Sequence, residues 1–131
     1  MSDAAGAVQA ALVTALRAGL GDRVTGVFDG PPAEAKLPYA AIGEATTSDW
    51  GAKGLEGREH RIAVVLWDEG GRPSRLHALM ALAEGAIDEM ARELGGHSIV
   101  GLLFLRARLV RDAGRPWAGL VEYRVRTVSL G

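Results

Sequence analysis

The chain has 131 residues, of which 48% are hydrophobic and 24% are charged, and its formal net charge at pH 7 is −1. This length predicts a single domain with its own core, and this composition excludes a wholly disordered chain. The absence of cysteine excludes disulfides, thiolate zinc sites and cysteine nucleophiles, and no apolar run approaches the roughly 18 residues of a membrane span, so we expect neither a transmembrane helix nor a signal peptide.

The first predicted element is a helix over residues 3–20. Its apolar side chains recur at the spacing of one helical face, at Val8, Leu12, Val13, Leu16 and Leu20. Ser2 or Asp3 can cap the first turn, and Gly21 favours a stop at the other end. The pattern therefore predicts an amphipathic helix that buries one face.

Three strands are predicted next, over residues 24–28, 39–44 and 59–67. Two consecutive prolines, Pro31 and Pro32, end the first strand region, because proline lacks the N–H that a sheet ladder needs. In the third strand Ile62, Val64 and Leu66 alternate with Arg61, Ala63 and Val65. This alternation predicts a strand with one better-buried face.

Residues 45–58 are predicted to form a long flexible loop, with glycines at positions 51, 54 and 57. The loop leads into a strand and carries no Gly-Lys-Ser/Thr run, so its glycines do not predict a phosphate site. Loops of this length are often functional. The candidate partner-contact residues within it are Asp49, Trp50, Lys53 and Arg58. The tryptophan either folds back onto the core or anchors a partner.

Residues 73–94 have the clearest helical pattern of the chain. One apolar stripe is formed by Leu76, Leu79, Met80, Ala83, Ile87, Met90 and Leu94. Proline at position 73 suits the start of a helix, and the glycines at 95 and 96 suit its end. A stripe of this kind needs a sheet to pack on.

The C-terminal part predicts a long hairpin with arms over residues 98–111 and 117–130 and a turn over 112–116. In each arm an apolar face alternates with a face that bears arginine. The predicted element order is α-β-β-β-α-β-β. We therefore expect an α+β fold, with two helices packed on a mostly antiparallel sheet.

Charge is distributed unevenly along the chain. Residues 1–97 contain 9 Lys/Arg and 14 Asp/Glu, for −5, whereas residues 98–131 contain 6 Arg and 2 acids, for +4. The hairpin arginines of the two arms are Arg106, Arg108, Arg124 and Arg126, with Arg111 and Arg115 near the turn. Three interpretations stay open: a solvated sheet face, a contact with an acidic protein surface, or a contact with nucleic acid phosphates.

The sequence offers no catalytic set. His60, His77 and His97 lack the i, i+4 spacing of a metal-binding helix, and we interpret them as ordinary surface or half-buried residues. The acid pairs Asp68-Glu69 and Asp88-Glu89 suggest solvated edges, and no serine lies in a nucleophile elbow. We therefore expect a protein that is not an enzyme and holds no metal or cofactor.

Five short stretches together resemble a known family. They are Leu-Pro-Tyr-Ala-Ala-Ile-Gly-Glu at 37–44, Thr-Ser-Asp-Trp at 47–50, Gly-Arg-Glu-His-Arg at 57–61, Leu-Arg-Ala-Arg at 105–108 and Asp-Ala-Gly-Arg-Pro-Trp at 112–117. In this order and spacing the chain resembles the tail-completion, or tail-terminator, proteins of long-tailed bacteriophages and gene transfer agents. The resemblance covers nearly the whole of residues 1–131, as one tail-terminator-like domain.

The resemblance implies a structural virion protein. Such proteins form a hexameric ring on the head-proximal end of the tail tube, end tail elongation and present a surface to the head–tail connector. The implied partners are other copies of the chain, the tail tube protein, the connector (stopper) protein and DNA that passes through the lumen without sequence specificity, with no membrane. The implied location is the neck of the particle, after assembly in the bacterial cytoplasm.

Two hypotheses follow for particular residues. Arg106, Arg108, Arg124 and Arg126 meet a neighbouring subunit or the lumen, and the 45–58 loop orders on contact with the tail tube or the connector, with Trp50 as its anchor. The alternative functions are a head–tail connector or stopper component and a DNA-binding accessory protein that uses the arginine hairpin.

Overall fold

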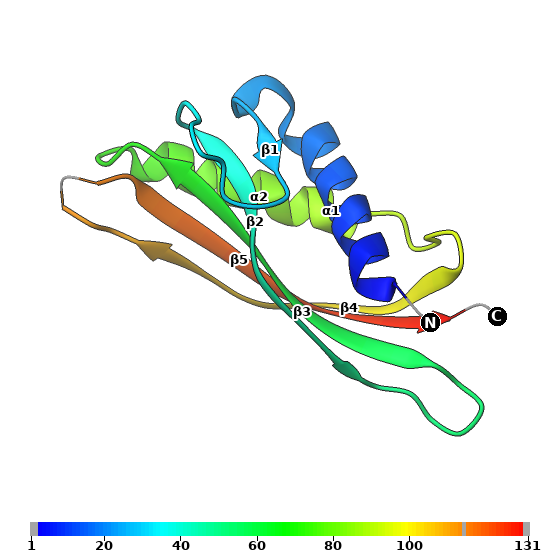
Figure 1. The fold of residues 1–131 in the computed structure, drawn as a ribbon. Helices are drawn as coiled ribbons and strands as arrows, with labels where there is room; N and C mark the ends of the chain where they lie inside the picture. The colour runs from blue at the N-terminus through cyan, green and yellow to red at the C-terminus, as the bar shows by residue number, and fades with distance from the viewer. Residues whose placement is uncertain (1–2, 114, 130–131) are drawn as a thin grey trace.

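A computed structural model describes residues 3–113 and 115–129, and it shows two helices on one face of a five-stranded sheet (Figure 1). The elements are α1 (Ala4–Leu20), a 3-10 turn η1 (Gly21–Arg23), β1 (Val27–Phe28), β2 (Tyr39–Asp49), β3 (Gly57–Asp68), α2 (Pro73–Asp88), β4 (His97–Val110) and β5 (Trp117–Ser129). The strand order is β1-β2-β3-β5-β4. β1 is parallel to β2 and the other neighbours are antiparallel, which confirms the predicted fold class and element order.

The helix α1 forms as the sequence predicts. The Asp3 carboxylate accepts a hydrogen bond of 3.1 Å from the backbone N–H of Gly6, whereas Ser2, the other proposed cap, lies outside the described residues. By length and composition the stretch Ala4–Arg23 could cross a membrane, with a mean hydropathy of 1.2. In this fold it is a core helix, and its predicted apolar face is buried against α2 and the sheet.

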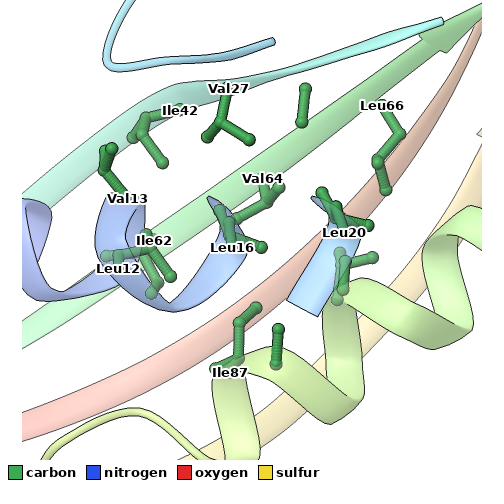
Figure 2. Packing of buried hydrophobic residues seen from close by; sticks show 14 of the residues in the cluster. Leu12, Val13, Leu16, Leu20, Val27, Ile42, Ile62, Val64, Leu66 and Ile87 are labelled. Atoms are coloured by element: carbon green, nitrogen blue, oxygen red, sulfur yellow. The ribbon is translucent and has the colours of Figure 1, made fainter. Parts of the chain in front are cut away.

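The core lies between the two helices and the inner face of β2, β3 and β5 (Figure 2). Leu12, Leu16 and Leu20 of α1 meet Ile62 and Val64 of β3 there. The close approach of α2 to β5 requires glycine at position 119, because a Cβ there would lie only 2.6 Å from the sulfur of Met80. The helices therefore pack closely on the inner face of the sheet at its centre.

The prediction of a long flexible loop over residues 45–58 is wrong, because most of these residues belong to two paired strands. β2 continues to Asp49 and β3 begins at Gly57, and the register pairs Ala45 with Ile62 and Asp49 with Arg58. The apolar alternation of β2 stops at Ile42, where the register shifts, and the residues that follow are exposed small and polar ones. This end of the β2–β3 hairpin projects beyond the helices (Figure 1), and residues 44–49 of β2 have no buried face for the sequence pattern to record.

Two other boundaries and the regularity of β4 also differ from the prediction. α2 ends at Asp88 instead of residue 94, because the chain turns there: the N–H of Leu94 bonds the carbonyl of His97 at 2.8 Å, and the N–H of Ile99 bonds that of Arg92 at 2.7 Å. β1 contains only Val27 and Phe28. In β4 two register shifts interrupt the predicted alternation. The predicted turn glycine at 114 and arm end at 130 lie outside the described residues.

Candidate interaction surface

The face of the sheet opposite the helices carries all four of the predicted arm arginines. Because Ile62 and Val64 of β3 and Val121 and Val125 of β5 point into the core, the residues that alternate with them point to the other side. We call this side the open face; its residues include Arg61, Ala63 and Val65 of β3, Leu120, Glu122, Arg124 and Arg126 of β5, and Arg106 and Arg108 of β4. A shallow depression of about 390 Å³ lies between β2, β3, β5 and β4 on this face.

Acidic residues of the same sheet partner three of the four arginines. Arg126 Nε lies 3.0 Å from Glu59 Oε1, and Arg124 Nε lies 3.8 Å from the same oxygen. Arg106 donates a hydrogen bond to Glu122, which holds the pKa of that carboxyl below its usual value even though burial acts in the opposite direction. Among the described residues no ion pair involves Arg108, and its side chain is exposed.

The end of the β2–β3 hairpin joins the open face through Trp50. The guanidinium of Arg126 lies 4.7 Å from the centre of the Trp50 ring, a cation–π contact. The ring also lies against Gly57, where a Cβ would be 3.1 Å from Trp50 Cε3. Trp50 is therefore folded back on its own hairpin, although 37% of its surface stays exposed.

The other predicted partner-contact residues lie around this tip. Arg58 pairs with Asp49 at 3.5 Å and with Glu56 at 3.7 Å. Lys53 is exposed in the turn, and no ion pair of the described residues includes it. The structure thus pairs Asp49 with Arg58 across the hairpin and places Trp50 in contact with Arg126, one of the four predicted arm arginines.

Both outer edges of the sheet expose backbone. β4 pairs with β5 on one side, and on its outer side residues 92–94 pair only with its first residues, His97 to Ile99. Beyond Ile99 the outer edge of β4 has no strand partner among the described residues, and the large exposed apolar side chains there are Val100, Leu103, Phe104 and Val110, each between 43% and 53% exposed. At the other edge β1 pairs only with Ala40 and Ala41 of β2. Within the part of the chain that the structure describes, residues 43–49 of β2 therefore pair with β3 on one side and with no strand on the other.

The interpretation of His60 as a surface or half-buried residue is wrong. This side chain is 1% exposed; its Nδ1 lies 3.0 Å from Thr47 Oγ1 and its Nε2 lies 2.9 Å from Thr127 Oγ1. Burial lowers the pKa of His60, and the positive charges of Arg58 and His97 lower it further. A neutral His60 thus joins β2, β3 and β5 through two hydroxyl groups.

The prediction that Asp68 lies on a solvated edge is also wrong. Asp68 is fully buried, and both of its oxygens accept hydrogen bonds from Arg75, of which the Nε bond is 2.7 Å long. Burial alone would raise the pKa of Asp68, but the bonds from Arg75 and from the backbone N–H of Glu69 outweigh it, so the pKa lies below its usual value. This pair fastens the start of α2 to the end of β3.

Sequence reasoning missed the acidic partners Glu59 and Glu122. The available signal was their place in the alternation, because each shares a strand face with the arginines near it. Over residues 3–113 and 115–129, no three histidine, aspartate or glutamate side chains gather closely enough to hold a metal ion.

Comparisons with known proteins match the sequence to a family of tail completion proteins and the fold to solved structures. The family model described as tail completion protein gp17 matches residues 5–128. A chain in the structure "Virion of native gene transfer agent (GTA) particle" superposes with a TM-score of 0.79 and 24% identity, covering 98% of this chain and 100% of that chain. The gp17 protein of bacteriophage SPP1 gives a TM-score of 0.56 and 16% identity, covering 95% of this chain and 91% of that one. At these identities both likenesses show a shared fold, and no curated protein matches by sequence.

Proposed function

The chain belongs to the tail completion protein gp17 family, a family of structural virion proteins and not of enzymes, and on that premise we propose that it caps the head-proximal end of a phage or gene-transfer-agent tail tube as a hexameric ring. The ring ends tail elongation and forms the surface to which the head–tail connector binds. The single observation that carries the proposal is the extent of the family match, which leaves only the first four and last three residues outside it. The chain would assemble in the bacterial cytoplasm and remain in the neck of the particle.

The shape of the subunit suits a ring. In a closed ring each interface joins two different patches of neighbouring copies. This sheet has two different outer edges, and the helices cover one face only. A ring built from such subunits has room for the helices on its outside, where the circumference is larger, and for the open face on its inside.

The open face then borders the lumen through which DNA passes. It carries the guanidinium groups of Arg61, Arg106, Arg108, Arg124 and Arg126, and the carboxylates of Glu59 and Glu122 offset two of them. A moderate positive charge of this kind attracts phosphates without reading bases. The pairing of Arg106, Arg124 and Arg126 within the chain favours this role over a separate DNA-binding function, which would leave more of the cations unpaired.

The tip of the β2–β3 hairpin is the proposed contact with the tail tube or the connector. It projects beyond the helices (Figure 1), and its residues include Trp50, Asp49, Lys53 and Arg58. Trp50 is held in place by Arg126 and is still partly exposed. An aromatic side chain fixed in this way can enter a partner pocket without losing much conformational freedom.

Deletion of the gene in a strain that makes the particles tests this proposal, with tail length and head attachment measured by electron microscopy. Over-long or headless tails are the expected result. Tails of normal length that fail to join heads would reassign the chain to the connector or stopper. Normal particles would contradict both assignments, and the salt dependence of the protein's affinity for DNA would then test the accessory alternative.

A further inference from the structure

We propose that neighbouring copies of this chain join through backbone hydrogen bonds, with the outer edge of β4 in one copy paired to residues 43–49 of β2 in the next. The sheets of successive copies then form one continuous antiparallel sheet around the ring. This inference rests on the proposed ring and names the surface that holds it together. The partner at both edges is therefore a second copy of the same chain.

The strand directions permit this pairing. β2, β3, β5 and β4 alternate in direction because each adjacent pair is antiparallel. A β2 strand placed beside β4 continues the alternation, with the helices of both copies on the same side of the joined sheet. The unpaired edges of both strands are then satisfied, as they are when a sheet closes on itself.

The two free edges also lie at the same level of the sheet. The register places Thr46, Arg61, Arg124 and Leu103 in one row across β2, β3, β5 and β4. The row that contains Ala41, which β1 covers, ends on β4 at Arg108. The uncovered half of β2 is thus level with the part of β4 near Leu103, and the covered half is level with the part near Arg108.

The side chains of β4 follow the same division. Val100, Leu103 and Phe104 are exposed apolar residues in the half that is level with the uncovered part of β2. Arg108 is level with Ala41, which β1 covers, and Arg106 lies at the border, level with the register shift of β2 between Ile42 and Ala45. Charge at these positions discourages strand addition. Three of the four large exposed apolar side chains of β4 thus lie where a partner strand has room, which fits pairing with another copy better than contact with solvent.

Disulfide trapping in assembled particles tests the pairing directly, since the natural chain contains no cysteine. One double variant combines Thr46→Cys with Leu103→Cys and tests the register in which these two residues lie opposite each other. A second combines Thr46→Cys with Gly101→Cys and tests a register shifted by about two residues. Within one copy positions 46 and 103 are three strand spacings apart, about 14 Å, so a disulfide between them must join two copies. Oxidation should give a ladder of linked chains up to six, whereas a mixture of the two single variants should give dimers at most.

Charge substitutions give an independent test with a matched control. Val100→Lys and Leu103→Lys should reduce ring formation on tails at least about tenfold while the purified chain keeps its melting temperature, because both side chains are exposed. Val110→Lys is the control: Val110 is exposed to a similar degree on the same strand, but its row ends on β2 at Tyr39, beside the β1-covered residues. It should leave ring formation unchanged.

The outcomes separate this inference from the proposed function. Two results would overturn the edge pairing and leave the ring intact. The first is particles with normally capped tails that give no cross-linked ladder in either register, and the second is equal assembly of the three lysine variants. Particles in which the tail carries no copy of the chain would overturn the ring itself and the pairing with it.

Discussion

His60 is a neutral, buried group that makes the stability of the fold depend on pH. The unfolded chain binds a proton at this residue with a pKa near 6.5, while burial, Arg58 and His97 lower the pKa in the folded state. The contribution is therefore complete above about pH 6.5 and is lost as the pH falls below that value. We expect the free energy of unfolding in urea to decrease from pH 7.5 to pH 5.

Two histidine variants show whether His60 is the source of this pH dependence. His60→Gln removes the titrating group and should flatten the profile between pH 5 and 7.5, with lower stability at pH 7.5 because the bonds to Thr47 and Thr127 change. His77→Gln, an exposed position on α2, should leave the profile unchanged. A profile that is equally steep in wild type and His60→Gln would assign the dependence to other groups.

The Asp68–Arg75 pair stabilises the junction between β3 and α2. Asp68→Asn removes a buried charge-assisted pair, and we expect a loss of about 1.5–3 kcal/mol in the free energy of unfolding at pH 7. The loss should shrink as the pH falls through the lowered pKa of the wild-type carboxyl, because that carboxyl is then protonated. Arg75→Lys keeps the charge but not the forked geometry and should lose less.

Neither residue could have been identified from the sequence pattern. His60 occupies a core-facing position of β3 that an apolar residue normally fills, and its hydroxyl partners lie 13 positions before it and 67 positions after it in the chain. Asp68 follows the strand directly and precedes Glu69, so the two acids look alike in sequence. Only Asp68 is buried, and its partner there is Arg75, in the first turn of α2.

At the scale of elements, the hairpin tip is held by Trp50 and Arg126. Trp50→Ala should increase trypsin cleavage after Lys53 in the free protein about two- to five-fold, because the cation–π contact at an exposed site is worth about 0.5–1 kcal/mol. Leu55→Ala, in the same turn and 45% exposed, is the control and should cleave at the wild-type rate. Equal rates for both variants would mean that the tryptophan does not hold the tip closed.

The elements were predictable where they border the core and poorly predictable where they leave it. α1, β3, the start of α2 and β5 carry apolar patterns that the helices and the inner face of the sheet bury, and all four lie close to their predicted positions. The far half of β2 has no such pattern because both of its faces are exposed. The apolar residues Met90 and Leu94 continue the α2 stripe, yet they belong to a turn that the chain makes to reach β4.

At the scale of the whole molecule, charge is divided between two faces. The α2 segment and the turn after it carry Glu84, Asp88, Glu89 and Glu93, whereas the open face carries the arginines. The sequence showed this division as an acidic first part and a basic hairpin, but not that Glu59 and Glu122 hold three of the arginines in place. Reversing Arg124 or Arg126 would therefore disturb the sheet, and Arg108 is the better probe of the open face.

Arg108→Glu tests whether the open face borders the DNA path. Arg108 is exposed and no described ion pair includes it, so the reversal should leave the melting temperature within about 2 °C of wild type and allow tails of normal length to be capped. Each copy changes the charge by −2, which in a ring of six makes the lumen repel phosphates, and the yield of DNA delivered per particle should fall several-fold. Arg23→Glu makes the same change on the helix side, in η1, and should deliver DNA normally. If both variants deliver DNA equally well, Arg108 does not face the lumen, and the open face serves another contact.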